Sequence, residues 1–393
     1  MLSSFERGVT ILINNAIKSE NAPLPEDFDY SRLYEFARDQ QILPLIYYGG
    51  RNLPEFISHD ANRKIYASSM FLSLRNQNQE AELDELCRAF EENGVDYMKL
   101  KGSVIKRFYP SGDMRLMGDA DILIRQEQMG KIEELMQALG YSHQVTSDHE
   151  WIWRREELGV ELHKRMIPSY TKDLYAYFGE GWDLARRRSE NGCEYALSIE
   201  DELIYLVSHF TKHYRYAGIG IKHLIDIHVL LGSNVAIDHG YVNDTLEKLG
   251  ILKFYENIKR MLDVWFKGDE CDEVSEFITK RIFSGGAYGT SRERSRYEAA
   301  ALTKATDAKR ARRMKLWRVV FPSYKNMCED RPWLQKYPVL LPFAWVGRLV
   351  TVLLFKRDHI RRERENISAI NKSEIEAYKQ ELRLVGLDFN FEV

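Results

Sequence analysis

The chain lacks several features that would assign it to a class at once. Its 393 residues carry a formal net charge of only −3, so the strongly basic balance typical of nucleic-acid-binding domains is absent. Its four cysteines are scattered and form no CxxC pair, which argues against a disulfide scaffold and a zinc ribbon. There is no internal repeat and no low-complexity segment. We therefore expect an ordinary globular protein without a long nucleic acid as its partner.

Targeting and membrane signals are also missing. The first twenty residues, "MLSSFERGVTILINNAIKSE", have neither the basic start nor the long apolar core of a signal peptide. Scattered cysteines in a chain of this length are typical of reduced thiols. Together with the missing signal peptide, they predict a cytoplasmic protein. One apolar run, Pro338 to Phe355, approaches membrane-spanning length, but Pro342 interrupts it and Arg348 charges its middle. We expect a buried or surface-lying helix there rather than a membrane contact.

What is present divides into three parts. Residues 1–94 carry apolar residues at helical spacing and end at Gly94, as an N-terminal helical region would. Residues 95–167 alternate in short runs, in the order strand, strand, helix, strand, strand, strand. Residues 197–393 return to helical patterns, opening with a Ser198 cap. The sequence therefore predicts an α+β fold, with a small mixed β-sheet core between N-terminal helices and a large C-terminal helical region.

Two aspartates enter a short apolar strand in "GDADILI". Side chains at positions i and i+2 of a strand project from the same face, so Asp119 and Asp121 would present two carboxylates together. Carboxylates that close repel unless a cation lies between them. Magnesium, which favours oxygen ligands, is the natural cation, and manganese could substitute. Glu161 in "GVELHKR" supplies a third acid if that strand lies beside the first, and His163 could orient Glu161 or contact substrate.

The segment before these acids offers groups that bind phosphate. Gly102 and Ser103, at a strand-to-helix turn, can present backbone amides and a hydroxyl to a triphosphate. Lys101 and Arg115 can neutralise phosphate charge, Arg115 as a two-pronged fork. From the helical side, Lys212 in "HFTKH" is a candidate phosphate or base contact, which we favour over a metal site at the flanking histidines.

The segment "LKGSVIKRFYPSGDMRLMGDADILI" resembles the DNA polymerase beta-like nucleotidyltransferase superfamily. More closely, it is similar to an uncharacterised bacterial nucleotidyltransferase family marked by "LKG", "YP", "R..GD.D.LV" and a later "LH". In this chain those motifs are Leu100–Gly102, Tyr109–Pro110, Arg115 with Gly118–Ile124, and Leu162–His163. The resemblance implies a nucleotide and magnesium, and it leaves the acceptor open.

Together these observations predict a magnesium-dependent nucleotidyltransferase. It would move a nucleoside monophosphate from a nucleoside triphosphate, such as ATP, to a hydroxyl of a small molecule, sugar or protein side chain, releasing pyrophosphate. Asp119, Asp121 and Glu161 would be the catalytic metal ligands. Two alternatives stay open. One is a kinase-like phosphotransferase that uses the same metal site, and the other is a non-catalytic nucleotide-sensing or partner-binding protein.

Overall fold

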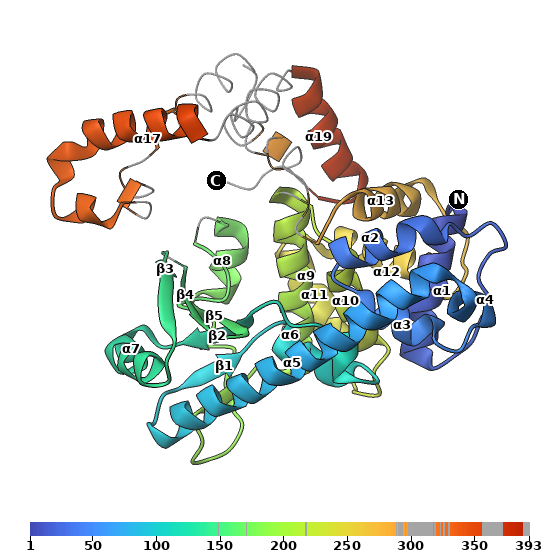
Figure 1. The fold of residues 1–393 in the computed structure, drawn as a ribbon, viewed down its shortest axis with the longest axis horizontal. Helices are drawn as coiled ribbons and strands as arrows, with labels where there is room; N and C mark the ends of the chain where they lie inside the picture. Colours follow the sequence, from blue (N-terminus) through green and yellow to red (C-terminus); the bar gives the residue numbers. More distant parts are fainter. Residues whose placement is uncertain are drawn as a thin grey trace.

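The computed structural model describes most of the chain (Figure 1). The described residues are 1–147, 149–169, 171–216, 218–287, 289, scattered positions from 294 to 328, 331–355 and 372–387. Figure 1 shows the β-sheet and α7 at one end of the main body and helices α1–α4 at the other, with α5 running between them. The fold is α+β. It contains a small mixed sheet, and helices precede and follow the strands of this sheet in the sequence.

The N-terminal part is helical. Helix α1 begins with a capping box, in which the Ser3 hydroxyl accepts from the Glu6 amide and the Glu6 carboxylate accepts from the Ser3 amide. Helix α3 packs directly on α1 at Gly49, where an added Cβ would lie 1.8 Å from the Leu12 carbonyl oxygen. Only glycine allows that approach. The helices of this part are α1 (Ser4–Lys18), η1 (Tyr30–Arg32), α2 (Leu33–Asp39), α3 (Leu43–Gly50), α4 (Pro54–Ser58) and α5 (Asp60–Glu92).

Seven strands form one sheet in the order β3-β4-β5-β2-β1-β7-β6. The pairs β2–β5 and β1–β7 are parallel, and the remaining neighbours are antiparallel. The predicted succession of strands and helix across the core is confirmed, and two further short strands beyond residue 167 extend the sheet. The strands are β1 (Tyr97–Lys99), β2 (Ala120–Ile124), β3 (Ser142–Thr146), β4 (Glu150–Arg155), β5 (Leu158–His163), β6 (Arg186–Arg187) and β7 (Glu194–Ala196).

The two faces of the sheet pack against different partners. Ile122 and Ile124 point to one face, where they join a hydrophobic cluster with α5 and α7 (Met129–Ala138). Leu123, between them, points to the other face and joins the larger core shared with the helical region. Because side chains alternate along a strand, Asp121 lies on the same face as Leu123. The acidic site therefore faces the C-terminal helices.

Those helices wall the site from the opposite side. Helix α9 begins as predicted, since the Ser198 hydroxyl accepts from the Asp201 amide. Along the described residues no helix is both long and apolar enough to cross a membrane. The helices of this part among the described residues are α8 (Lys172–Phe178), α9 (Ile199–Tyr216), α10 (Ile221–Leu231), α11 (His239–Lys248), α12 (Leu252–Phe266), α13 (Glu273–Ser284), η5 (Pro332–Gln335), η6 (Pro338–Leu340), α17 (Leu341–Phe355) and α19 (Lys372–Leu384).

Candidate functional site

The parallel pairing of β2 with β5 brings acidic and histidine side chains together. Asp121 lies directly opposite Glu161 in the register, and Leu123 lies opposite His163. The Nε2 atom of His163 is 2.7 Å from Asp121 Oδ1 and 3.6 Å from Glu161 Oε2. Each of the three residues offers a ligand atom within 4.8 Å of the others, so the group has the composition and size of a metal site. Asp119, which precedes β2, is exposed and lies outside this group, although its charge acts on Glu161.

Lys101 supplies a cation to this group. Its ammonium donates a hydrogen bond to Asp121 Oδ1 at 2.5 Å. Burial alone would lower the pKa of Lys101, but the charge and hydrogen bond of Asp121, together with the charges of Tyr205 and Glu161, outweigh burial and raise it. Burial likewise favours a higher pKa for Asp121, but Lys101 and His163 hold that pKa well below its usual range. Both groups are therefore ionised at neutral pH.

Glu161 behaves in the opposite way. Burial and the neighbouring charges of Asp121 and Asp119 raise the pKa of Glu161 to about 9. The single ammonium of Lys101 is not enough to keep both facing carboxyls ionised. The arrangement therefore has one positive charge too few, and a divalent cation would supply it.

The turn that follows β1 brings Lys101 to the acids. The Leu100 amide donates to the Asp121 carbonyl at 2.9 Å, which fastens the turn to β2. Lys101 itself has φ +53°, a conformation that costs a non-glycine residue about 1–3 kcal/mol. Helix α6 (Gly102–Ile105) then begins, and the Ser103 hydroxyl donates back to the Leu100 carbonyl at 2.8 Å.

Arg115 is engaged elsewhere in the structure. Its guanidinium forms a two-pronged pair with Asp226 of α10, with Nε–Oδ1 and Nη2–Oδ2 distances of 2.7 and 2.8 Å. Tyr109 donates its hydroxyl to the same carboxylate at 2.8 Å, and Arg115 Nη1 donates to the Leu116 carbonyl. The guanidinium also packs on Gly102, where an added Cβ would lie 3.1 Å from its nitrogens. Arg115 thus links the Gly102 turn to the helical region, and its predicted contact with phosphate stays a prediction.

The helical side contributes Lys212 of α9. Burial, followed by the charge of Lys101, lowers the pKa of Lys212 to about 8, and the charges of Glu150 and Asp121 oppose that shift. Lys212 is therefore close enough to interact electrostatically with the acidic group and with the Lys101 ammonium. This position fits the predicted contact with a nucleotide, which remains untested.

Two neighbours of His163 were not singled out in the sequence. Glu150 lies opposite His163 in the β4–β5 hairpin, with Oε2 3.6 Å from His163 Nδ1, and the His149 ring centre lies 4.9 Å from that of His163, with the two rings tilted by 55°. Burial, with the charges of His163 and Lys212, lowers the pKa of His149 to about 2. The sequence does contain a signal for Glu150. The two strands alternate as a hairpin, and the register of that hairpin fixes which residue lies opposite His163.

Most of the chain matches a known protein family. Residues 26–267, more than half of the chain, match the model of a protein family described as "Uncharacterised nucleotidyltransferase". No curated protein matches the chain. Among solved structures it is similar to the solution structure of antibiotic-resistance factor ANT(2'')-Ia, with 12% sequence identity and a TM-score of 0.32. That match covers 49% of this chain and 100% of the other. A structural likeness this low is no basis for an inference about function.

Proposed function

The chain belongs to this family of uncharacterised nucleotidyltransferases, and we propose that it transfers a nucleoside monophosphate from a nucleoside triphosphate to an acceptor hydroxyl, releasing pyrophosphate. The observation that carries the proposal is the pairing of Asp121 with Glu161 across two parallel strands, beside the Lys101 ammonium. The acceptor is a small molecule, a sugar or a protein side chain.

The residues present fit a divalent cation. Asp121 and Glu161 face one another, and burial together with the charges of Asp121 and Asp119 raises the pKa of Glu161. These two carboxylates would hold magnesium, or manganese in its place, with Asp119 close by and His163 as a nitrogen donor. When bound, such an ion lowers the pKa of an attacking hydroxyl and stabilises negative charge on the leaving pyrophosphate.

The other residues have supporting roles in the proposal. Lys101 holds Asp121 ionised through their hydrogen bond and would offer its ammonium to a phosphate oxygen of the nucleotide. His163 orients the Asp121 carboxylate through its 2.7 Å hydrogen bond. Lys212 contacts the nucleotide from α9. The buried Arg115–Asp226 pair keeps the Gly102–Ser103 turn in place against the helical wall.

A cytoplasmic location belongs to the same proposal. A reaction that consumes nucleoside triphosphates needs the compartment that holds them. The unpaired state of Cys87, Cys193, Cys271 and Cys328 suits a reducing environment.

Product analysis tests the proposal. The full chain is incubated with each of the four α-labelled nucleoside triphosphates, magnesium and a cell-extract acceptor pool, and pyrophosphate and labelled products are followed. Nucleotidyl transfer gives pyrophosphate and a labelled acceptor, whereas a phosphotransferase releases a nucleoside diphosphate. Asp121→Asn should abolish turnover, and Asp183→Asn, at an exposed aspartate outside the site, should leave it unchanged. Wild-type protein that forms neither product with any acceptor pool would favour a non-catalytic, nucleotide-sensing role.

A further inference from the structure

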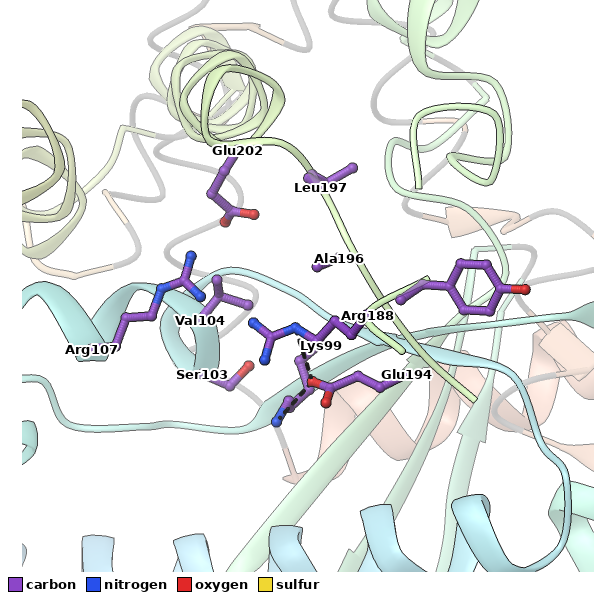
Figure 2. A pocket seen from close by; sticks show the side chains of 10 residues that line it. Lys99, Ser103, Val104, Arg107, Arg188, Glu194, Ala196, Leu197 and Glu202 are labelled. Atoms are coloured by element: carbon purple, nitrogen blue, oxygen red, sulfur yellow. Dashed lines mark ion pairs between the residues drawn. The ribbon is translucent and has the colours of Figure 1, made fainter. Parts of the chain in front are cut away.

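A cavity of about 150 Å³ lies beside the Gly102–Ser103 turn, outside the acidic group described above (Figure 2). It is formed by segments far apart in the sequence: the end of β1, helix α6 and η2 (Lys106–Phe108), the strand β7, and the start of α9. Figure 2 shows the side chains of Arg107, Arg188 and Glu202 reaching into it from different sides. None of these three residues is among the candidate site residues of the sequence analysis, although Arg107 lies within the segment that resembles the nucleotidyltransferases.

The cavity has more positive than negative charge. Lys99, Arg107 and Arg188 line it, and Glu194 is their main counter-charge. Glu194 Oε1 lies 3.1 Å from Lys99 Nζ and only 3.8 Å from Arg188 Nε, so one carboxylate serves two cations. Arg107 forms no ion pair or hydrogen bond with any residue that the structure describes, and its guanidinium lies 4.8 Å above the Phe108 ring. Two guanidinium groups are therefore available to a ligand.

Glu202 gives the cavity a second unusual feature. The residue is only 3% exposed, and its Oε1 atom has no hydrogen-bond partner among the described residues. Burial raises the pKa of Glu202 to about 8, against the opposing charge of Arg107. At neutral pH its carboxyl is thus mostly protonated, adds no negative charge, and can donate a hydrogen bond. An unpartnered buried polar group of this kind is costly unless a ligand completes it.

We propose that this cavity binds phosphate groups of a substrate, held by Arg107 and Arg188, with Glu202 completing the site. Arginine forks match phosphate oxygens in geometry and charge. The inference rests on the proposed function, and it adds Arg107 and Arg188 as phosphate contacts at a site separate from Lys101 and Arg115, which pair with Asp121 and Asp226. The phosphate could be carried by the nucleoside triphosphate or by a phosphorylated acceptor.

Calorimetry with inorganic pyrophosphate, in EDTA to remove any metal-dependent binding, tests the cavity directly. We expect the full-length wild type to bind, and Arg107→Gln and Arg188→Gln each to weaken binding about tenfold or more, as the loss of a charged hydrogen bond predicts. Arg188→Lys keeps the charge but loses the fork, so its effect should be smaller. Arg186→Gln, an exposed arginine on β6 that does not line the cavity, is the matched control and should bind like the wild type. Both arginines are exposed, so these variants should fold, which thermal unfolding checks.

A second titration separates the two sources of phosphate. If the cavity holds phosphates of the nucleotide, ATP should displace pyrophosphate, and Arg107→Gln should weaken ATP but not AMP. If it holds the phosphate of an acceptor, ATP and pyrophosphate should bind together. Either result supports the cavity as a phosphate site.

Pyrophosphate affinity unchanged in the Arg107→Gln/Arg188→Gln double variant would overturn the inference and leave the proposed transfer reaction standing. Failure of the wild type to turn over any triphosphate, with pyrophosphate binding still lost in the double variant, would overturn the reaction instead.

Discussion

The Lys101 ammonium lies 2.5 Å from Asp121 Oδ1, on a residue whose backbone adopts φ +53°. The turn after β1 thus holds a strained conformation that delivers a positive charge to Asp121, the second residue of β2. Strained residues of this kind persist where the surrounding structure over-determines them, and they cluster at functional sites. In this protein the strained residue, Lys101, is also the residue of the turn that contacts the acidic group.

Replacing Lys101 tests whether its ammonium occupies part of a cation site. Lys101→Met keeps most of the length of the side chain but leaves Asp121 buried without its main counter-charge. We expect a loss of about 3 kcal/mol in the free energy of unfolding, measured in urea without metal. Magnesium should then raise the melting temperature of the variant more than that of the wild type, because the ion replaces the missing charge. Lys248→Met, at an exposed lysine of α11, is the control. Equal magnesium shifts in variant and wild type would contradict this interpretation.

We expect the Arg115–Asp226 pair to contribute mainly to the stability of the fold rather than to the reaction. The two side chains are 7% and 2% exposed, so removal of one partner leaves the other charged and buried. We expect Arg115→Met and Asp226→Asn each to lower the free energy of unfolding by about 3–5 kcal/mol. The double variant should lose less than the sum of the two, as a double-mutant cycle would measure. If Arg115→Met instead weakened nucleotide binding with no loss of stability, Arg115 would be the direct phosphate contact that the sequence predicts.

Gly102 should tolerate no side chain. A Cβ at this position would lie 3.1 Å from both terminal nitrogens of Arg115. That guanidinium cannot move aside cheaply because Asp226 holds it in two places. We expect Gly102→Ala to cost about 1–3 kcal/mol in urea unfolding, in the range of other overpacked sites. The same change at Gly130, where an added Cβ meets nothing within 4 Å, should cost no stability through crowding. Equal costs at the two positions would argue against the packing of Arg115 on Gly102.

The sequence could predict those parts of the site that depend on local periodicity. Alternation places Asp121 on one face of β2, and the parallel neighbour in "GVELHKR" then brings Glu161 opposite. Glycine stops and strand alternation likewise predicted the order of elements through the core. The resemblance of the motifs pointed to the family that the chain belongs to.

The partners of individual charges could not be predicted in this way. Arg115 and Asp226 are 111 positions apart, and no local pattern connects a loop arginine with one acid of a distant helix. Strands β6 and β7 have two and three residues, too few for a period-2 pattern to be visible. The cavity at Glu202 has one wall from β7, which is too short to be predicted, and another from α9.

Glu202 should make the stability of the protein depend on pH in a direction opposite to that of acids whose pKa is lowered on folding. Its pKa in the folded protein is about 8, above the value of 4.5 expected in the unfolded chain. The folded state therefore keeps a proton that the unfolded state has already lost, and stability falls as pH rises from about 4.5 to about 8. Each pKa unit corresponds to about 1.4 kcal/mol, so the full effect amounts to several kcal/mol.

Glu202→Gln removes this titration while keeping the shape of the neutral side chain. The melting temperature of the variant relative to the wild type should therefore increase between pH 5 and pH 9, and stay level above that range. Glu190→Gln, at an exposed glutamate, should show no such trend. A difference between Glu202→Gln and wild type that is constant across this range would mean that Glu202 is ionised in the folded protein at neutral pH. The cavity would then hold an additional negative charge, and its affinity for pyrophosphate should be correspondingly weak.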